Sequence, residues 1–510
     1  MKIAADEHSA GPLHDLAEAL ANRPAQLLIR SDQGDMTVTQ FAAASRSAAN
    51  FLRGAGIRKG DRVAVMAANS IEHLAVVYGI WLVGGVEVAV NTELRGPLLR
   101  HVLADSDPTL VIVDKALRSR VEAEAPALPA VALEDVAFTD SIAPTTFGPR
   151  PRSSELASLL YTSGTTGPSK GVMIPHGYYS YYAAILGRVV ELSPADVTYF
   201  CLPFFHVDAH IAVPASLQHG SAFAFVPRFS VSGFWRDLER FEATWFGGVG
   251  AMLSALINSA TPPSSVLQRL RLILAAPVPE EAFAWFTDRH GVPILQMYGQ
   301  TEANGPIYSS LDDNRRGAMG KVRADFDISI VGPDGNEAPD GTVGQMLTRP
   351  RRADIICQGY WQRPSATDAA FADGWFHTGD LVRRDSDGFF WYAGRLTDSL
   401  RRRGENVSAY ELESVVRSAP GVLECAAIGV TDALGGEDEI KVFLVVDDEA
   451  VFDPITFRDF CAALLPRFAV PRYVQLADPD SLVRGPGTGA IQKHLLDRSV
   501  AEQVIDLTRC

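Results

Sequence analysis

The stretch "ASLLYTSGTTGPSKGVMIPH", residues Ala157 to His176, decides how the rest of the chain is interpreted. An apolar run passes directly into eight residues, Thr162 to Ser169, that hold five hydroxyl groups and two glycines, and Lys170 follows them. Glycines let backbone N–H groups turn toward an anion, hydroxyls donate hydrogen bonds to it, and a lysine adds positive charge. No Gly-Lys-Ser/Thr sequence closes the segment, so it is not a Walker loop. The segment therefore predicts a strand that leads into a phosphate-binding loop, with a flexible linker as the alternative for this composition.

The chain on both sides of this stretch alternates between strand and helix patterns. Before it, "DRVAVMAAN" (61–69) predicts a strand, "IEHLAVVYGIWLVG" (71–84) a helix and "VEVAVN" (86–91) a strand. The same rhythm returns after it, from "SAFAFVP" (221–227) onward. Such alternation is typical of parallel β-α-β units. We therefore expect two α/β sub-domains in the first 330 residues.

The pattern changes in the last third of the chain. From Asp325, alternating strands with turn dipeptides predict a β-rich module, and a charged stretch runs from Arg395 to Arg403. Helix and strand patterns that begin at "SAYELESVVRSA" (408–419) then predict a separate small domain. The expected fold is α/β, with a large N-terminal domain (1–395) of two α/β sub-domains plus the β-rich module, and a small α+β C-terminal domain (398–510).

Composition excludes several classes of function. The chain has 46 Lys and Arg against 61 Asp and Glu, a formal charge of −15, which argues against general binding to nucleic acid or anionic membrane. The first residues lack the cationic start and apolar run of a secretory signal, and the longest apolar stretch contains Glu87 and several glycines, so no membrane span is expected. Five cysteines without metal-ligand spacing fit a reducing cytosol. We expect a cytoplasmic protein.

The phosphate-loop segment resembles the signature of the adenylate-forming (ANL) enzymes, which include acyl-CoA synthetases, luciferases and nonribosomal peptide adenylation domains. Further segments resemble the other signatures of that family, in the family's order: "LPFFHVDAH" (202–210), "LAAPVPEEAF" (274–283), "MYGQTE" (297–302), "GWFHTGD" (374–380) and "GRLTDSLRRRGENVSAYELE" (394–413). The resemblance covers nearly the whole chain, and several independent motifs in one order argue strongly against chance agreement. Parts of these segments look like the carnitine and crotonobetaine-CoA ligase branch.

The resemblance implies a nucleotide site. Tyr298 would offer an aromatic face to adenine, Thr301 a hydroxyl near the α-phosphate, and Glu302 a hard oxygen ligand for Mg²⁺. Asp380 and Arg395 resemble the residues that bind the ribose hydroxyls, although a lone Asp or Arg is more often a turn residue or half of a surface ion pair. The predicted ATP- and AMP-binding residues are Thr162, Ser163, Gly164, Thr165, Thr166, Gly167, Lys170, Ala275, Ala276, Pro277, Tyr298, Gly299, Gln300, Thr301, Asp380 and Arg395.

An acyl pocket is implied beside the nucleotide. His206 falls where the family has a side chain near the passage from carboxylate to thioester, whereas a lone histidine is more often structural. Asp208 and His210 follow at alternate positions, so on a strand the three side chains would share one face. An acidic group there could receive a cationic or hydrogen-bonding substrate. The predicted acyl pocket contains His206, Asp208, Val249 and Gly250, within a run of small residues that leaves space.

The implied chemistry has two half-reactions, with ATP, Mg²⁺ and coenzyme A as cofactors. A small carboxylic acid attacks the α-phosphate and releases pyrophosphate, and a thiol then displaces AMP. The resemblance implies a mobile C-terminal domain with its hinge at Thr397, where Asp or Lys is usual, and Gly404 and Glu405 near coenzyme A. The alternatives are transfer to a carrier-protein pantetheine, to an amine or to another nucleophile, and a non-catalytic nucleotide-binding protein. The resemblance to the family also implies a possible homodimer.

The C-terminal loop "RGPGTGAIQK" (484–493) departs from the family. In the family, a lysine of this loop would bridge the carboxylate and the α-phosphate, and its position aligns with Ala490 in this chain. Lys493 would need a register shift to reach that point. Loss of a preorganised donor costs about 3 to 4 kcal/mol, or roughly two to three decades in rate. Engineering and natural loss are both open explanations, and the other intact motifs favour engineering. The predicted catalytic positions are Thr162, His206, Thr301, Glu302 and Ala490.

Overall fold

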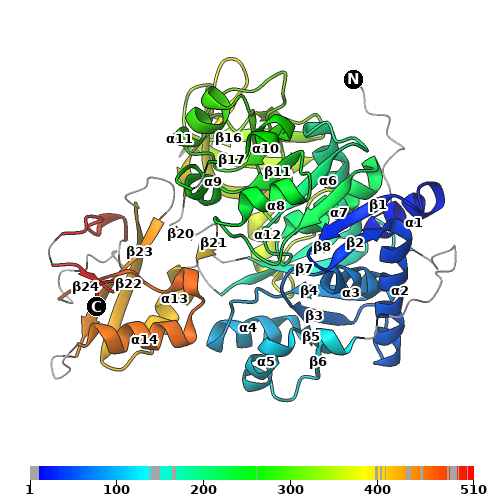
Figure 1. Cartoon of the computed structure of the whole chain (residues 1–510). Coiled ribbons are helices and arrows are strands. Elements are labelled where there is room, and N and C mark those ends of the chain that lie inside the picture. Colours follow the sequence, from blue (N-terminus) through cyan, green and yellow to red (C-terminus); the bar gives the residue numbers. More distant parts are fainter. Residues whose placement is uncertain are drawn as a thin grey trace.

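The computed structural model describes most of the chain. The described residues are 11–136, 138, 150–162, 168–259, 261–332, 334–396, 400–402, 405–407, 409–431, 438–447, 452–478, 482, 491, 493–501 and 503–510. Residues 163–167 of the predicted phosphate loop, the predicted hinge Thr397, Gly404 and Ala490 lie outside them. A large N-terminal body stands beside a smaller group that includes the C-terminus (Figure 1), which confirms the predicted α/β class with a small α+β C-terminal domain.

The first sheet has the order β6-β5-β3-β4-β7-β8 and is parallel except for β8, which runs antiparallel to β7. Strands β4 and β5 are buried along their whole length, as expected for parallel strands covered on both faces. The elements are β3 (Arg62–Met66), β4 (Val86–Ala89), β5 (Leu110–Val113), β6 (Ala130–Ala132), β7 (Leu156–Thr162) and β8 (Lys170–Pro175), with α2 (Val38–Gly54), α3 (Ile71–Leu82), α4 (Gly96–Ser106), η1 (Lys115–Leu117), α5 (Arg118–Glu124) and η2 (Leu133–Asp135).

The second sheet has the order β15-β14-β13-β12-β11-β9-β10-β1-β2. Strands β1 and β9 to β13 run parallel, and antiparallel strands extend the sheet at both edges, β2 at one and β14 and β15 at the other. The strands are β1 (Leu27–Ser31), β2 (Gly34–Thr37), β9 (Val197–Phe200), β10 (Ala222–Phe225), β11 (Trp245–Gly248), β12 (Leu272–Ala275), β13 (Ile294–Tyr298), β14 (Ile307–Tyr308) and β15 (Lys321–Val322). The helices are α1 (Pro12–Asn22), α6 (His176–Val189), α7 (Val207–His219), α8 (Phe234–Arg240), α9 (Gly250–Ile257), α10 (Ser264–Arg269), α11 (Glu280–Ala282) and the π-helix η3 (Phe283–Arg289).

An antiparallel sheet and the C-terminal elements follow. The sheet β16-β17-β18-β19 contains β16 (Phe326–Val331), β17 (Gly344–Pro350), β18 (Phe376–Arg384) and β19 (Phe390–Arg395), with α12 (Pro364–Ala370) and η4 (Ala372–Gly374) before β18. The C-terminal elements pack around a hydrophobic cluster of their own. They are β20 (Leu400–Arg402), β21 (Glu405–Val407), α13 (Ala409–Val416), β22 (Val422–Thr431), β23 (Asp438–Val446), α14 (Pro454–Leu464), η5 (Arg467–Ala469), β24 (Tyr473–Leu476), η7 (Lys493–Leu495) and β25 (Ile505–Asp506).

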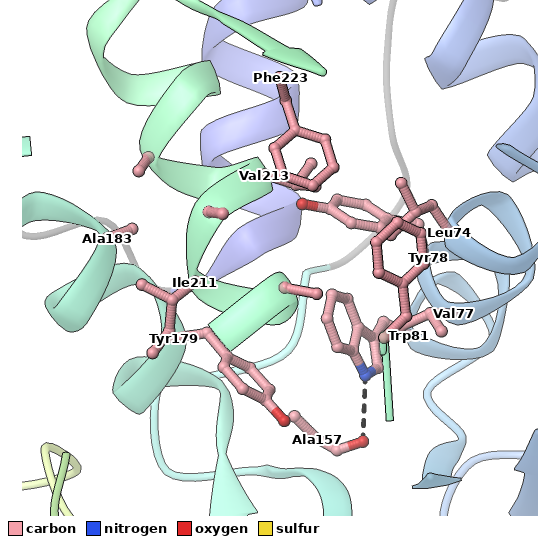
Figure 2. Packing of buried hydrophobic residues seen from close by; sticks show 14 of the residues in the cluster. Leu74, Val77, Tyr78, Trp81, Ala157, Tyr179, Ala183, Ile211, Val213 and Phe223 are labelled. Atoms are coloured by element: carbon pink, nitrogen blue, oxygen red, sulfur yellow. Dashed lines mark hydrogen bonds between the residues drawn. The ribbon is translucent and has the colours of Figure 1, made fainter. Parts of the chain in front are cut away.

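A buried aromatic cluster joins the two α/β sheets behind the phosphate-loop strand (Figure 2). Trp81 on α3 packs against Tyr78 and against Tyr179 on α6, with ring centroids 5.0 and 5.6 Å apart. Its indole Nε1 donates a hydrogen bond of 3.0 Å to the carbonyl oxygen of Ala157 on β7. Helix α3 itself begins after Ser70, whose side chain accepts the backbone N–H of His73. The core therefore fixes the strand from which the predicted loop departs.

One expectation about the fold is wrong. His206, Asp208 and His210 do not lie on one face of a strand, because the chain turns at Pro203 and begins helix α7 at Val207. His206 is the N-cap of that helix, and His210 lies one turn later with its Nδ1 3.1 Å from the carbonyl oxygen of His206. Alternate positions on a helix point in different directions, so the three side chains separate. Among the described helices, none combines the length and hydrophobicity that a membrane crossing requires.

Candidate active site

Three of the predicted nucleotide residues meet at a buried carboxylate. Asp380 on β18 is 2% exposed, and its Oδ2 accepts hydrogen bonds from the Tyr298 hydroxyl at 2.6 Å and from Gln300 Nε2 at 2.5 Å. Tyr298 ends β13, so the two sheets present these groups together. Arg395 ends β19 and lies opposite Asp380 in the strand register. The predicted ribose-binding carboxylate is therefore held in place by donors from the "YGQ" turn.

The predicted phosphate-loop lysine and the predicted magnesium ligand are linked by Tyr360. The Nζ atom of Lys170, which begins β8 opposite Thr162, lies 4.9 Å from the centroid of the Tyr360 ring. The hydroxyl of Tyr360 donates a 2.9 Å hydrogen bond to Oε1 of Glu302, which is 9% exposed. Thr301 accepts a hydrogen bond at its carbonyl oxygen from Tyr178, at 3.0 Å. Sequence analysis missed Tyr360, which stands 58 positions after Glu302 in an unremarkable "QGYW" segment.

A cavity of about 250 Å³ lies beside these residues. It is lined by the predicted acyl residues Asp208 and Val249 and by the predicted nucleotide residues Ala275, Ala276 and Gly299. Gly250 and Pro277 are not among its lining residues. They lie against each other, since a Cβ atom built on Gly250 would come within 2.8 Å of the Pro277 carbonyl oxygen. Apolar and aromatic side chains make most of the wall, together with Arg323, which sequence analysis missed.

His206 lies elsewhere, at the seam between the two domains. It lines a second cavity of about 110 Å³ together with Glu405 of β21 and residues of α13 and η5. His206 Nε2 is 3.1 Å from Glu405 Oε1, and the backbone N–H of Ser169 donates a 2.5 Å hydrogen bond to Glu411 Oε1 on α13. The predicted site residues His206 and Glu405 therefore face one another across the seam between the domains.

A buried ion pair supports the helix that follows His206. His210 Nε2 lies 2.9 Å from Glu87 Oε2, and the Ser158 hydroxyl donates a 2.7 Å hydrogen bond to the same oxygen. Burial alone would lower the pKa of His210 and raise the pKa of Glu87, but their mutual attraction and hydrogen bonds reverse both directions. The pair ties α7 to β4 and β7. A lone glutamate inside the apolar "VEVAV" strand was the sequence signal for it.

Comparison with known proteins places this arrangement in context. A sequence model described as "AMP-binding enzyme" matches residues 16–361, and one described as "AMP-binding enzyme C-terminal domain" matches residues 411–483. The sulfoacetate–CoA ligase of Cupriavidus necator is 30% identical over 498 residues, covering 94% of this chain and 96% of that protein. The crotonobetaine/carnitine–CoA ligase of Salmonella paratyphi A is 30% identical over 500 residues, covering 91% and 94%.

Two solved structures of one protein are similar to this chain over nearly its whole length. A double mutant of o-succinylbenzoate CoA synthetase from Bacillus subtilis, bound with its product analogue, is 25% identical and superposes with a TM-score of 0.83, covering 94% of this chain and 97% of that one. The same synthetase in complex with AMP, at the same identity and coverage, superposes with a TM-score of 0.69. The chain thus superposes better on the product-analogue complex than on the AMP complex.

Proposed function

Because this chain belongs to the AMP-binding, adenylate-forming enzymes, in their acyl-CoA synthetase class, we propose that it joins a small carboxylic acid to coenzyme A at the expense of ATP. The carboxylate attacks the α-phosphate and pyrophosphate leaves, and the thiol then attacks the acyl carbon and AMP leaves. One observation carries the proposal. Gly299 lines the acyl cavity, and its neighbours Tyr298 and Gln300 hold the Asp380 carboxylate.

The described residues suit the nucleotide side of this reaction. Asp380 would accept hydrogen bonds from the ribose hydroxyls, and its own hydrogen bonds with Tyr298 and Gln300 would set its orientation. Thr162 and Lys170, which pair across β7 and β8 at the base of the loop, would bring the loop residues 163–167 to the phosphates. The backbone of Ala275, Ala276 and Pro277 would border the adenine. Fixed donors of this kind need no rearrangement when charge develops on the phosphate.

Glu302 fits the predicted magnesium ligand. Its carboxylate is largely buried, and the Tyr360 hydroxyl orients it. Magnesium in nucleotide sites is commonly held by one or two carboxylates together with the phosphates themselves. The bound ion would neutralise phosphate charge as the carboxylate approaches, and Thr301 beside Glu302 would place its hydroxyl at the α-phosphate.

The acceptor side of the proposal rests on the cavity between the domains. The predicted coenzyme A residue Glu405 and the predicted passage residue His206 both line it. We propose free coenzyme A as the acceptor, with a carrier-protein pantetheine as the alternative of the same chemistry. A cytoplasmic location belongs to the proposal and is supported by Cys201, Cys357, Cys425 and Cys461, which are buried thiols. A homodimer is also part of the proposal, and sedimentation equilibrium would test it.

We propose further that the chain is a lysine-to-alanine form impaired in adenylation, with Ala490 at the position of the family lysine. Lys493 offers no replacement, because its Nζ atom lies 2.6 Å from Oε1 of Glu413 on α13. Glu413 Oε1 also accepts the backbone N–H of Ala427 on β22 at 2.6 Å. The cation nearest in sequence is thus engaged inside the C-terminal domain.

Restoring the lysine tests the function. Ala490→Lys should raise pyrophosphate release by about 100-fold or more on at least one acid of a carboxylic acid panel, the size expected for a restored preorganised donor. Ala463→Lys, an exposed position on α14, is the matched control and should change nothing. Acyl-CoA formation with free coenzyme A as the sole thiol then identifies the acceptor. Tight ATP binding without turnover on any acid would instead establish a non-catalytic nucleotide-binding protein.

A further inference from the structure

The acyl cavity contains a buried arginine. Arg323 follows β15, is 4% exposed and lines the cavity. Its Nη1 donates a 2.8 Å hydrogen bond to the carbonyl oxygen of Gly305, and its Nη2 donates one of 2.8 Å to the hydroxyl of Tyr181. Aromatic rings surround the guanidinium at 5.0 to 5.8 Å, from Tyr181, Tyr182, Tyr308 and Phe326. The side chain is therefore fixed in position by its neighbours.

The charge of Arg323 is not balanced by an ion pair. Within the described residues, no carboxylate oxygen lies within 4.0 Å of its guanidinium, and Asp325 is connected to it through the hydroxyl of Tyr181, which donates a 2.8 Å hydrogen bond to Asp325 Oδ2. A guanidinium has five N–H donors, and the hydrogen bonds above account for two of them. A buried charge is costly unless it is paired, so the site is suited to an anion that arrives with a ligand.

A second polar group at the cavity has an unused hydrogen-bond donor. Tyr182 on α6 lines the cavity and is 3% exposed, and its hydroxyl has no hydrogen-bond partner among the described residues. Arg323 lies 5.5 Å from the Tyr182 ring centroid, so both groups belong to one wall. Asp208, which also lines the cavity, is exposed, so water solvates its carboxylate while the Arg323 guanidinium is buried.

We propose that this wall is a subsite for a second carboxylate, so that the cavity takes a dicarboxylic acid. The planar fork of an arginine matches a carboxylate with two parallel hydrogen bonds, and Tyr182 would add a third donor. Apolar walls such as Phe200, Trp245 and Leu274 would contact the methylene chain between the two carboxylates. The inference rests on the proposed function, because it takes the cavity to be the acyl site.

Binding measurements test the subsite without relying on turnover. Isothermal titration calorimetry with the chain as it stands, in the presence of ATP, would compare glutarate, adipate and suberate with their monomethyl esters, which lose one charge and gain one methyl group. At least one diacid should bind about 100-fold more tightly than its ester, in keeping with the selectivity of sites built around a buried polar group. Arg323→Met should abolish that ratio. Arg349→Met is the matched control, since Arg349 also stacks on an aromatic ring, Trp375, but does not line the cavity.

The outcomes separate the two proposals. Equal binding of every diacid and its ester, or equal weakening of both by Arg323→Met, would overturn the subsite. If Arg323→Met fails to fold, Tyr182→Phe removes one hydroxyl and should lower the diacid-to-ester ratio by about 10-fold, and an unchanged ratio would contradict the inference. Diacids that bind through Arg323 but give no pyrophosphate with Ala490→Lys would refute the proposed function and leave the subsite standing. Turnover that prefers the monoesters would support the proposed function and refute the subsite.

Discussion

The core behind the phosphate-loop strand and the seam between the domains are built differently. In the core, aromatic side chains from α3, α6 and β10 are buried together with aliphatic side chains (Figure 2). The seam includes short polar contacts, such as Ser169 N to Glu411 Oε1, His206 to Glu405, and Arg95 Nη1 to the carbonyl oxygen of Ala462 at 3.2 Å. Water can replace polar contacts of this kind, whereas it cannot replace a packed core. The seam should therefore be easier to open than the core.

The largest effect should follow from Trp81→Ala in the core. Trp81 is 1% exposed, and truncation of a buried tryptophan costs about 3 to 5 kcal/mol of unfolding free energy. Chemical denaturation followed by circular dichroism would measure the loss, with Leu423→Ala as the control because Leu423 is 63% exposed. A loss in Trp81→Ala no larger than the control would mean that this core does not carry the stability of the domain.

Acid should weaken the core next. Burial lowers the pKa of His73 to about 4, and its Nε2 atom has no partner in the described part of the chain, while Nδ1 lies 3.1 Å from the Ala68 carbonyl oxygen. Between pH 6.5 and 4 the unfolded chain binds a proton that the folded chain excludes, so stability falls as the pH falls, by about 3 kcal/mol in total. Burial lowers the pKa of His176 to about 3, which adds to the same trend.

Melting temperatures from pH 7.5 to 4.5 would measure this slope. His73→Gln should make the slope shallower, because glutamine does not titrate while the His176 contribution remains, and His377→Gln in the β-rich module is the control. A slope identical in both variants would contradict the assignment to His73.

The smallest effect on stability should come from the seam. Glu405→Gln removes one charge from the contact with His206, and a partly exposed pair contributes about 1 kcal/mol or less. The melting temperature should hardly change. The distance distribution between spin labels on Cys510 and on a cysteine introduced at Lys115 should broaden, as measured by pulsed electron paramagnetic resonance, while Asp459→Asn should leave it unaltered. A large loss of stability would place Glu405 with the core instead of the seam.

Local sequence patterns predicted helices and strands, but they could not predict contacts between residues that are far apart in the sequence. Strand β7 leads into the hydroxyl-rich loop as expected, because an apolar run of strand length determines such an element locally. The period of two at His206, Asp208 and His210 suggested a strand, but the turn at Pro203 starts a helix there. Arg323 and Tyr360 could not be predicted as site residues, since only the packing of separate strands and helices brings them to the cavity and to Glu302.

Tyr360 contacts two side chains of opposite charge. Its ring face holds the ammonium of Lys170, and its hydroxyl holds the carboxylate of Glu302. One rigid phenol thus fixes a positive end and a negative end at a set separation. The proposed phosphate site therefore has a built-in electric dipole, along which a polyanion and its counter-ion would be arranged by sign as they enter.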